Sequence, residues 1–165
     1  MIAGLLVAAA LAVCYPPPVD APVSVPFVQP ACTYCGGHRG LEYRLAPGTP
    51  VRFIAPGVVT FAGQVAGTEY VVVLQIDGLK ATYGQLQVAL VARGDVVAVG
   101  QAAGRSGPQL YFGLRNAADT PIDPAPLLGV LVGRVRLVPG HGGGERRVSV
   151  PRRICAAIVS SVSTV

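Results

Sequence analysis

The residues best equipped for chemistry lie close together near the first third of the chain. Cys32, Cys35 and His38 form the pattern C-x-x-C-x-x-H, and Glu42 follows four residues after the histidine. Thiolate, imidazole and carboxylate groups all bind zinc, so this stretch has the side chains for a metal site. Three other interpretations remain open: a local disulfide, free thiols, or a surface histidine beside a solvated or ion-paired glutamate.

The N-terminal residues predict export. Residues 1–13 read MIAGLLVAAALAV, an apolar run that is too short to span a bilayer, which takes about 20 residues, and that suits the core of an export signal. No basic residue precedes the run, and LAVC (11–14) is a weak match to a lipidation motif. A short buried helix is the alternative. We expect residues 1–15 to be an export signal and the protein to be extracytoplasmic, secreted or membrane-anchored in the cell envelope. An oxidising compartment favours a disulfide between Cys32 and Cys35.

Glycine and proline set the expected fold class. The 165 residues include 21 Gly and 15 Pro, which argues against a helical bundle. Residues 16–30 are rich in proline and predict an extended linker. Short β-rich runs then recur between turn residues, at 51–54, 58–62, 70–76, 79–83, 95–99 and 109–115. The pattern predicts an all-β domain over residues 31–129.

Two local signals refine this domain. Asp77-Gly78 separates two β-rich runs and predicts a two-residue hairpin turn with positive φ at both central positions. Alternation puts Tyr83 and Gln85 on one face of their run. In the run QLYFGLR the same rule predicts that three residues face the core: Leu110, Phe112 and Leu114. The other four residues face the opposite side: Gln109, Tyr111, Gly113 and Arg115.

The charge is unevenly distributed. The net charge is +5, residues 1–132 are neutral overall, and the excess lies in the basic, Gly-rich tail of residues 130–165. No aromatic residue follows Phe112, so the tail lacks the stacking side chains of a single-strand nucleic-acid site, and we expect no nucleic-acid partner. We expect a disordered tail whose arginines contact an anionic envelope surface. His141 and Cys155 lie in this tail, and an intermolecular disulfide through Cys155 stays open.

A series of motifs in order resembles a known family. The segments are HRGLE for H-x-G-x-D, APGTPVRFIAPGVVTFAG for an apolar A-P-x-G-T-P-V stretch, ATYGQL for x-T-Y-x-H-L, GDVVAVGQAAG for G-x-x-V-x-x-G-Q, and GPQLYFGLR for G-P-H-L-H-F-E-x-R. From His38 to Gly129 the chain thus resembles the lysostaphin and LytM-type zinc metalloendopeptidases, which cut peptide cross-links in peptidoglycan. The resemblance implies a folded-over antiparallel β-sheet sandwich, or hybrid barrel.

The departures from this family fall on its chemistry. The resemblance places the family's zinc ligands at His38, Glu42 and Tyr111, and its two further catalytic histidines at Gln85 and Gln109. It places Tyr83 and Arg115 in the groove. Tyrosine is a poor zinc ligand at neutral pH, and glutamine neither accepts nor delivers a proton as histidine does. We expect the Tyr111 hydroxyl to replace the metal by donating to Glu42 or His38, with an arginine as the alternative counter-charge.

The sequence therefore predicts a degenerate member of this family with no cofactor. Its expected role is a catalytically silent cell-envelope module that binds peptidoglycan peptides or regulates a cell-wall hydrolase. One alternative is an active zinc metalloendopeptidase with an altered ligand set that includes His38 and Glu42. A second alternative is a structural wall-associated protein held by its basic tail.

Overall fold

The computed structural model describes residues 14–32, 35–132 and 152–155. Its elements are almost entirely strands, because the sequence alternates apolar and polar residues between frequent turns. Their bounds are β1 (Val23–Val25), β2 (Leu41–Arg44), β3 (Pro50–Arg52), β4 (Gly57–Val65), β5 (Thr68–Gln75), β6 (Lys80–Ala89), β7 (Val96–Val97), β8 (Ala102–Arg115), β9 (Pro121–Ile122), a 3-10 turn η1 (Ala125–Leu127), β10 (Val130–Val132) and β11 (Arg152–Ile154). The six β-rich runs of the sequence all fall on this sheet, which confirms the all-β class.

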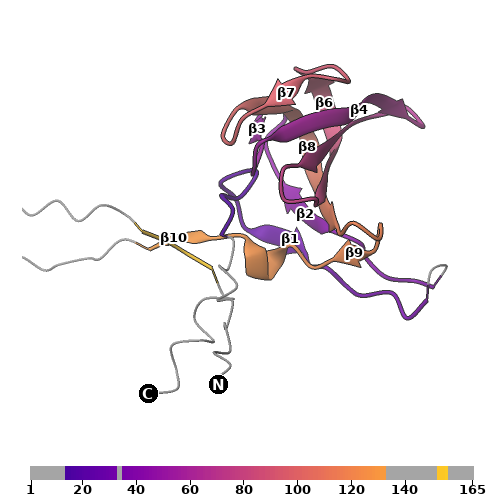
Figure 1. The fold of residues 1–165 in the computed structure, drawn as a ribbon, viewed down its shortest axis with the longest axis vertical. Helices are drawn as coiled ribbons and strands as arrows, with labels where there is room; N and C mark the ends of the chain where they lie inside the picture. Colours follow the sequence, from indigo (N-terminus) through magenta and orange to yellow (C-terminus); the bar gives the residue numbers. More distant parts are fainter. Residues whose placement is uncertain (1–13, 33–34, 133–151, 156–165) are drawn as a thin grey trace, which may run out of the picture.

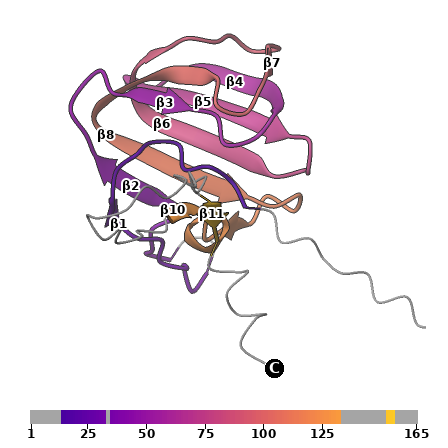
Figure 2. The same ribbon diagram turned by 90° about the vertical axis from the view of Figure 1, so that its left-hand side faces the viewer.

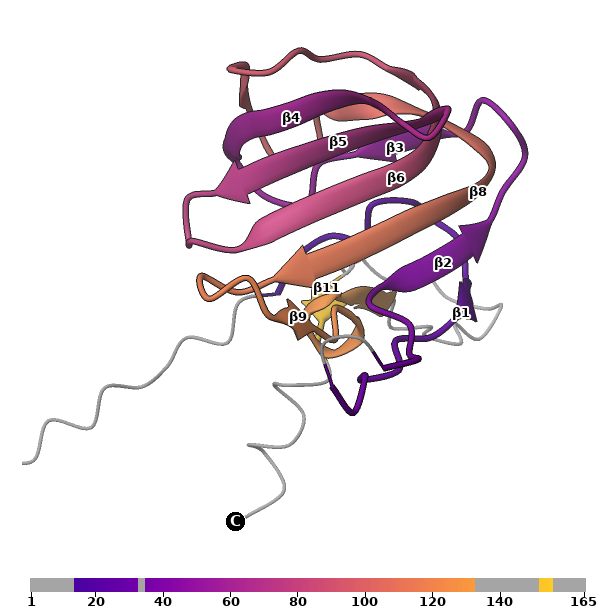
Figure 3. The ribbon, with the colours of Figure 1, turned by 90° about the vertical axis from the view of Figure 1, so that its right-hand side faces the viewer.

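One antiparallel sheet dominates the fold. Its strand order is β1-β2-β8-β6-β5-β4-β7, and β3 and β9 pair with the two ends of β8. Figure 3 shows β4, β5, β6, β8 and β2 following one another across one side of the molecule. From the other side, β3 and β7 lie over this sheet (Figure 2). The sheet therefore folds over on itself around a core, as the resemblance implied (Figure 1).

The bend of the sheet is built into β6 and β8. The 14-residue β8 pairs with β2 near its end and with β3 near its start. Its partner β6 has two register irregularities, between Gly84 and Leu86 and between Leu86 and Val88. Such bulges bend the strand and increase the local twist, so the two long strands can serve both halves of the sheet.

The core contains the residues that alternation assigns to it in β8. Leu110, Phe112 and Leu114 are all fully buried, which confirms that prediction. The ring centroid of Tyr83 lies 5.3 Å from that of Phe112 and 5.3 Å from that of Phe53. Burying such large rings is a major favourable contribution to a small β domain.

The placement of Tyr83 corrects an expectation. We expected Tyr83 in the groove, but its side chain is fully buried and its hydroxyl accepts a hydrogen bond of 3.0 Å from the Ile54 backbone N–H. In the register of β6 and β8, Tyr83 is opposite Phe112, which faces the core. Paired residues on neighbouring strands share a face, so Tyr83 must follow Phe112 inward. Burial also raises the pKa of this tyrosine.

The hairpin at Asp77-Gly78 is present, with a different turn from the expected one. It joins β5 to β6, and Gly78 has φ +85°, whereas Asp77 is not among the residues with positive φ. The Gln75 N–H donates to the Leu79 carbonyl at 2.8 Å. One glycine in the left-handed region after an ordinary turn is the geometry of a longer hairpin loop with a glycine bulge.

The proline-rich segment belongs to the folded unit. Pro18 and Val19 are buried, and β1 pairs with β2 at the edge of the sheet. Tyr15 exchanges backbone hydrogen bonds with Leu127 and Gly129 at 2.9 and 2.8 Å. Residues 16–30 are thus extended, as expected, but packed against the domain instead of linking it to something else.

The described ends of the tail are also ordered. β10 pairs with β11, and Cys155 is fully buried in a disulfide with Cys14, with 5.6 Å between the Cα atoms. The bond is therefore within the chain, unlike the intermolecular one left open above. His141 lies outside the described residues. Within the described ranges, no helix is long and apolar enough to cross a membrane.

Candidate functional site

Topology brings the three expected ligand positions together. His38 precedes β2 and is held in an isolated bridge with Val28, and Glu42 lies in the middle of β2. Tyr111 lies in β8, directly opposite Glu42 in the antiparallel register. All three are partly buried. Two sequence segments separated by most of the domain thus meet at one edge of the sheet.

His38 and Glu42 are paired with each other. The His38 Nε2 atom lies 3.3 Å from Glu42 Oε1, and Nδ1 lies 3.0 Å from the Pro26 carbonyl oxygen. Both contacts hold the imidazole ring in place, and which ring nitrogen donates depends on the tautomer.

Tyr111 has a different partner from the expected one. Its hydroxyl donates to the backbone carbonyl of Arg39 at 3.0 Å, not to Glu42 or His38. The reason is local: the chain turns at Arg39-Gly40 beside the ring, and a Cβ on Gly40 would lie only 2.8 Å from ring carbons of Tyr111. Burial raises the pKa of Tyr111, an effect that the positive charge of Arg115 partly opposes. The phenol is therefore neutral at physiological pH.

The two glutamines at the catalytic histidine positions differ in their settings. Gln85 has φ +61° and is the extra residue of β6 relative to β5, between Gly84 opposite Tyr70 and Leu86 opposite Glu69. A residue with a side chain is strained in that region, and such strain often lies near functional sites. Gln109 is exposed on β8, opposite Arg44. Simple alternation had placed Gln85 on the same face as Tyr83. The bulge explains why the two residues do not share a face.

Two tyrosine rings lie along the outer face of the sheet over glycines. Tyr70 of β5 is opposite Gly84, and a Cβ on Gly84 would overlap the Tyr70 ring. Tyr111 lies against Gly40, and a Cβ on Gly113 would lie 2.8 Å from its hydroxyl. Only glycine lets a ring approach the backbone this closely. The sequence analysis missed Tyr70, and its signal is the cross-strand match of tyrosine to glycine.

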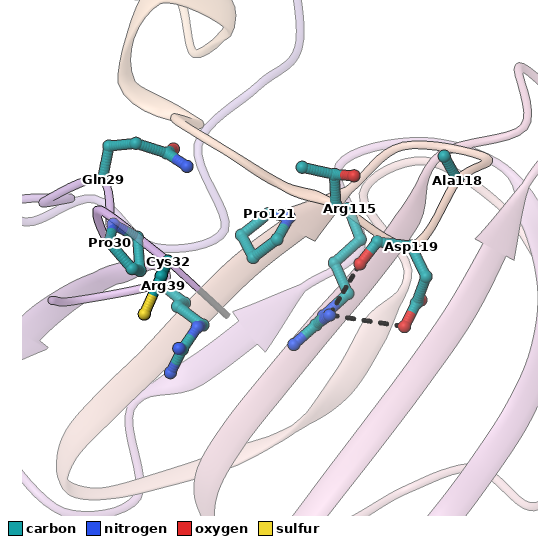
Figure 4. A pocket seen from close by; sticks show the side chains of 9 residues that line it. Gln29, Pro30, Cys32, Arg39, Arg115, Ala118, Asp119 and Pro121 are labelled. Carbon is teal, nitrogen blue, oxygen red and sulfur yellow. Dashed lines mark hydrogen bonds and ion pairs between the residues drawn. The ribbon is translucent and has the colours of Figure 1, made fainter. Parts of the chain in front are cut away.

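Arg115 lies in a pocket beside this site. The pocket has a volume of about 650 Å³ and is lined by Arg39 from the loop before β2 and by Arg115 and Asp119 from the end of β8 and the following turn. Figure 4 shows the two arginine side chains and the hydrogen bonds from Arg115 to Asp119. The sequence analysis had not singled out Arg39 or Asp119 as pocket residues.

The cysteines near His38 are in a disulfide. Cys32 and Cys35 are joined with 4.9 Å between their Cα atoms, the pairing that the sequence analysis favoured over a metal site or free thiols. Sulfur atoms in a disulfide are not thiolate ligands. In the part of the chain that the structure describes, no three His, Cys, Asp or Glu side chains are grouped as a metal site.

The family model for Peptidase family M23 matches residues 36–124, more than half of the chain. The chain belongs to this family. The matched segment starts just before His38 and ends after β9, so it contains strands β2 to β9 and the five positions expected for the family's ligands and catalytic histidines.

Curated relatives are about one-third identical to this chain over the aligned segment. The "DD-carboxypeptidase/endopeptidase Mpg" of Neisseria meningitidis is 32% identical over 94 residues, which cover 53% of this chain and 22% of that protein. The "Murein hydrolase activator EnvC" of Escherichia coli is 34% identical over 99 residues, covering 55% and 23%. The chain thus matches less than a quarter of the length of these relatives. One is named as a peptidase and the other as an activator of hydrolases.

Solved structures agree with the fold. Helicobacter pylori Csd3 has a TM-score of 0.61 at 25% identity, covering 79% of this chain and 37% of that one. The catalytic domain of lysostaphin from Staphylococcus simulans has a TM-score of 0.57 at 24% identity, covering 65% and 91%. A zinc-containing peptidase from Vibrio cholerae is also similar, with a TM-score of 0.57. These likenesses confirm the LytM-type fold.

The residues at the M23 ligand positions of this chain do not fit a zinc ion as they stand. A catalytic zinc takes three protein ligands and one open position. Here the third position is a neutral phenol that donates its proton to a backbone carbonyl. His38 and Glu42 alone keep the form of ligands, one fewer than a catalytic zinc takes.

Proposed function

We propose that this protein is an exported cell-envelope module that keeps the M23 fold, has lost metal-dependent hydrolysis, and binds peptidoglycan peptides or regulates a wall hydrolase. The observation that carries the proposal is the setting of Tyr111. Its neutral phenol is bound to the Arg39 carbonyl at the position of the third zinc ligand. The relatives include one protein named as a peptidase and one named as a murein hydrolase activator, and the second name supports a regulatory role.

The rest of the site supports a loss of catalysis. Hydrolysis by a zinc peptidase needs a metal-activated water and a group that moves protons. Gln85 and Gln109 lack any titratable group, so neither supplies the general acid or base. His38 and Glu42 lie 3.3 Å apart, and no third His, Cys, Asp or Glu side chain is grouped with them among the described residues.

The outer face of the sheet supports a binding role. Tyr70 and Tyr111 present aromatic rings over glycines, and Phe61 of β4 is 38% exposed on the same face. Rigid rings provide large contact area at a low cost in conformational entropy. A peptide in extended form lies well along such a face, with the Arg39/Arg115 pocket at its edge.

The disulfides support an extracytoplasmic location. Both pairs, Cys14–Cys155 and Cys32–Cys35, use all four cysteines of the chain. Disulfides form and persist in oxidising compartments and are rare in the cytosol. The apolar run at residues 1–13 is the core of the expected export signal of residues 1–15.

Zinc content and peptide cleavage test the proposal together. We expect the purified oxidised protein to retain no stoichiometric zinc after dialysis, measured by mass spectrometry of the metal. It should also leave cross-linked peptidoglycan uncut, while still sedimenting with it in the presence of a chelator. Gln87→Glu, an exposed polar change in β6 away from the site, serves as the matched surface control.

The runner-up is an active zinc metalloendopeptidase with His38 and Glu42 as ligands. It is favoured by one observation: these two side chains remain adjacent at the edge of the sheet. Stoichiometric zinc and chelator-sensitive release of cross-bridge peptides, both lost in His38→Ala, would establish this activity and contradict the silent role.

The second alternative is a structural wall protein held by its tail. Sedimentation with peptidoglycan distinguishes this alternative from the proposed peptide-binding module. Replacing the six tail arginines by glutamine keeps the full chain and removes the excess positive charge, the residues being Arg134, Arg136, Arg146, Arg147, Arg152 and Arg153. We expect sedimentation to persist at physiological salt. Its complete loss would show that the tail alone binds the wall.

A further inference from the structure

We propose that the pocket between Arg39 and Arg115 is a subsite for a carboxylate group of the bound peptide. The inference rests on the proposed peptide-binding role and names the chemistry that the site recognises. The pocket lies beside the degenerate zinc site but is separate from it. Its lining comes from the loop before β2 and the turn after β8.

Charge selects an anion for this pocket. Arg39 and Arg115 both line it, and Asp119 is the acidic residue of its lining. Asp119 is already committed to cations: Lys80 Nζ lies 3.1 Å from Oδ1 and Arg115 Nη1 lies 3.3 Å from Oδ2. The hydrogen bond from Lys80, together with the charge of Arg115, holds the pKa of Asp119 below its ordinary value. Asp119 thus pairs with two cations, and Arg39 adds a second guanidinium to the lining, which therefore has more basic than acidic side chains.

Arg115 keeps donors for a ligand. Its Nη1 atom donates to the Asp119 backbone carbonyl at 2.8 Å and faces Oδ2 of the same residue. Among the described residues, the hydrogen bonds of this guanidinium all go through Nη1. Guanidinium has five N–H donors in a planar fork, so its remaining edge matches the two oxygens of a carboxylate.

The walls of the pocket are rigid. The disulfide partner Cys32 and Pro30 form one side, and Pro121 of β9 lies on the other (Figure 4). The loop that bears Arg39 is tied down by two backbone hydrogen bonds of 2.9 Å between Val28 and His38. A subsite held in its binding geometry loses less conformational entropy when a ligand arrives.

The Tyr111 hydrogen bond connects the pocket to the peptide-binding face. Its acceptor is the carbonyl of Arg39 itself, so the ring and the pocket share one loop. A peptide that runs along the sheet over the tyrosines therefore ends, or places an acidic side group, next to the two guanidiniums. Peptide carboxylates come from these two sources, the chain terminus and the side group.

The test measures binding of three peptides to the full-length oxidised protein by isothermal titration calorimetry. The probe is the stem pentapeptide Ala–γ-D-Glu–Lys–D-Ala–D-Ala with both carboxylates free. The second peptide has an amidated C-terminus, and the third has the α-carboxylate of D-Glu amidated. The amidated form that loses about tenfold in affinity identifies the carboxylate that enters the pocket.

Arginine variants place the effect in this pocket. Arg115→Gln and Arg39→Gln should each lower the affinity for the peptide with free carboxylates by about tenfold. Each should also remove the difference in affinity between the free and amidated forms. Arg105→Gln is the matched control, because this exposed arginine of β8 also donates to one backbone carbonyl, that of Gly48, and lies outside the pocket. Thermal unfolding of each variant shows whether weaker binding comes with a loss of structure. Arg39→Gln leaves the contacts between Arg115 and Asp119 unchanged.

The outcomes separate this inference from the proposed function. Equal binding of all three peptides, unchanged by either arginine variant, would overturn the carboxylate subsite while leaving peptide binding intact. No binding of any peptide would overturn both the carboxylate subsite and the proposed peptide-binding role. Zinc-dependent cleavage combined with the tenfold arginine effect would overturn the silent role alone.

Discussion

At the scale of single residues, Tyr111 lies where the family resemblance predicts the third zinc ligand. Its ring packs against Gly40, and its hydroxyl donates to the Arg39 carbonyl at 3.0 Å. His38 lies within hydrogen-bond distance of both the Pro26 carbonyl and the Glu42 carboxylate. These partly buried polar side chains thus have partners, which avoids the penalty of an unpaired group.

Tyr111→Phe tests this account. The change keeps the ring but removes the donor, so the hydrogen bond to the Arg39 carbonyl is lost, and we expect a loss of about 1 kcal/mol in the free energy of unfolding. Tyr70→Phe is the matched control, because in the described part of the chain the Tyr70 hydroxyl has no hydrogen-bond partner, and it should change stability by less than about 0.5 kcal/mol. Urea denaturation measures both. Equal losses in the two variants would contradict the role of the Tyr111 hydroxyl.

At the scale of elements, glycines in β6 and β8 shape the outer face. Gly84 lies under the ring of Tyr70, and Gly113 lies beside the hydroxyl of Tyr111. Residues opposite each other on neighbouring strands have close Cβ positions, so a ring on one strand covers a glycine on the next. The bulge at Gln85 comes directly after Gly84 in the sequence and bends strand β6.

Gly84→Ala tests the packing of Tyr70 on the sheet. The new methyl group would displace the ring, and we expect a destabilisation of about 1 kcal/mol because the ring is partly exposed and can move outward. In the Tyr70→Ala background the same change should cost nothing, since the ring is gone. A double-mutant cycle of unfolding free energies measures the coupling, and additive losses would contradict the contact.

At the scale of the whole molecule, one covalent bond joins segments from the two ends of the chain. Cys14 and Cys155 are 141 positions apart in sequence. Tyr15, beside Cys14, is buried and its hydroxyl donates to the Asp77 carboxylate, while Cys155 is fully buried. The segment that we expected to be an export signal therefore contributes Cys14 and Tyr15 to the fold. A signal that is removed would have to end before Cys14, and a cysteine in this disulfide has no thiol left to carry a lipid.

Replacing both members of this bond should lower stability strongly. Closing a loop this long restricts the unfolded chain, and we expect Cys14→Ser with Cys155→Ser to lower the free energy of unfolding by about 2–5 kcal/mol in guanidinium titrations. Cys32→Ser with Cys35→Ser is the internal comparison, because that bond closes a loop of sequence separation 3 and should contribute less. A smaller loss for the long loop than for the short one would contradict this account.

The sequence by itself determined what depends on local pattern. Alternation identified the core face of β8 through Leu110, Phe112 and Leu114, and ordered motifs identified the family and the bent sheet. Side-chain period and turn residues act over a few positions, so they are readable without a structure. The Cys32–Cys35 pairing was accessible for the same reason.

Only the tertiary structure decided the contacts that depend on register and chain closure. One extra residue at Gln85 breaks the alternation, and pairing with Phe112 sends Tyr83 into the core. The partner of Tyr111 depends on the path of the loop at Arg39, and the Cys14 bond depends on where both ends of the chain lie. These contacts join residues far apart in sequence, and no short-range pattern records which distant groups the folded backbone brings within bonding distance.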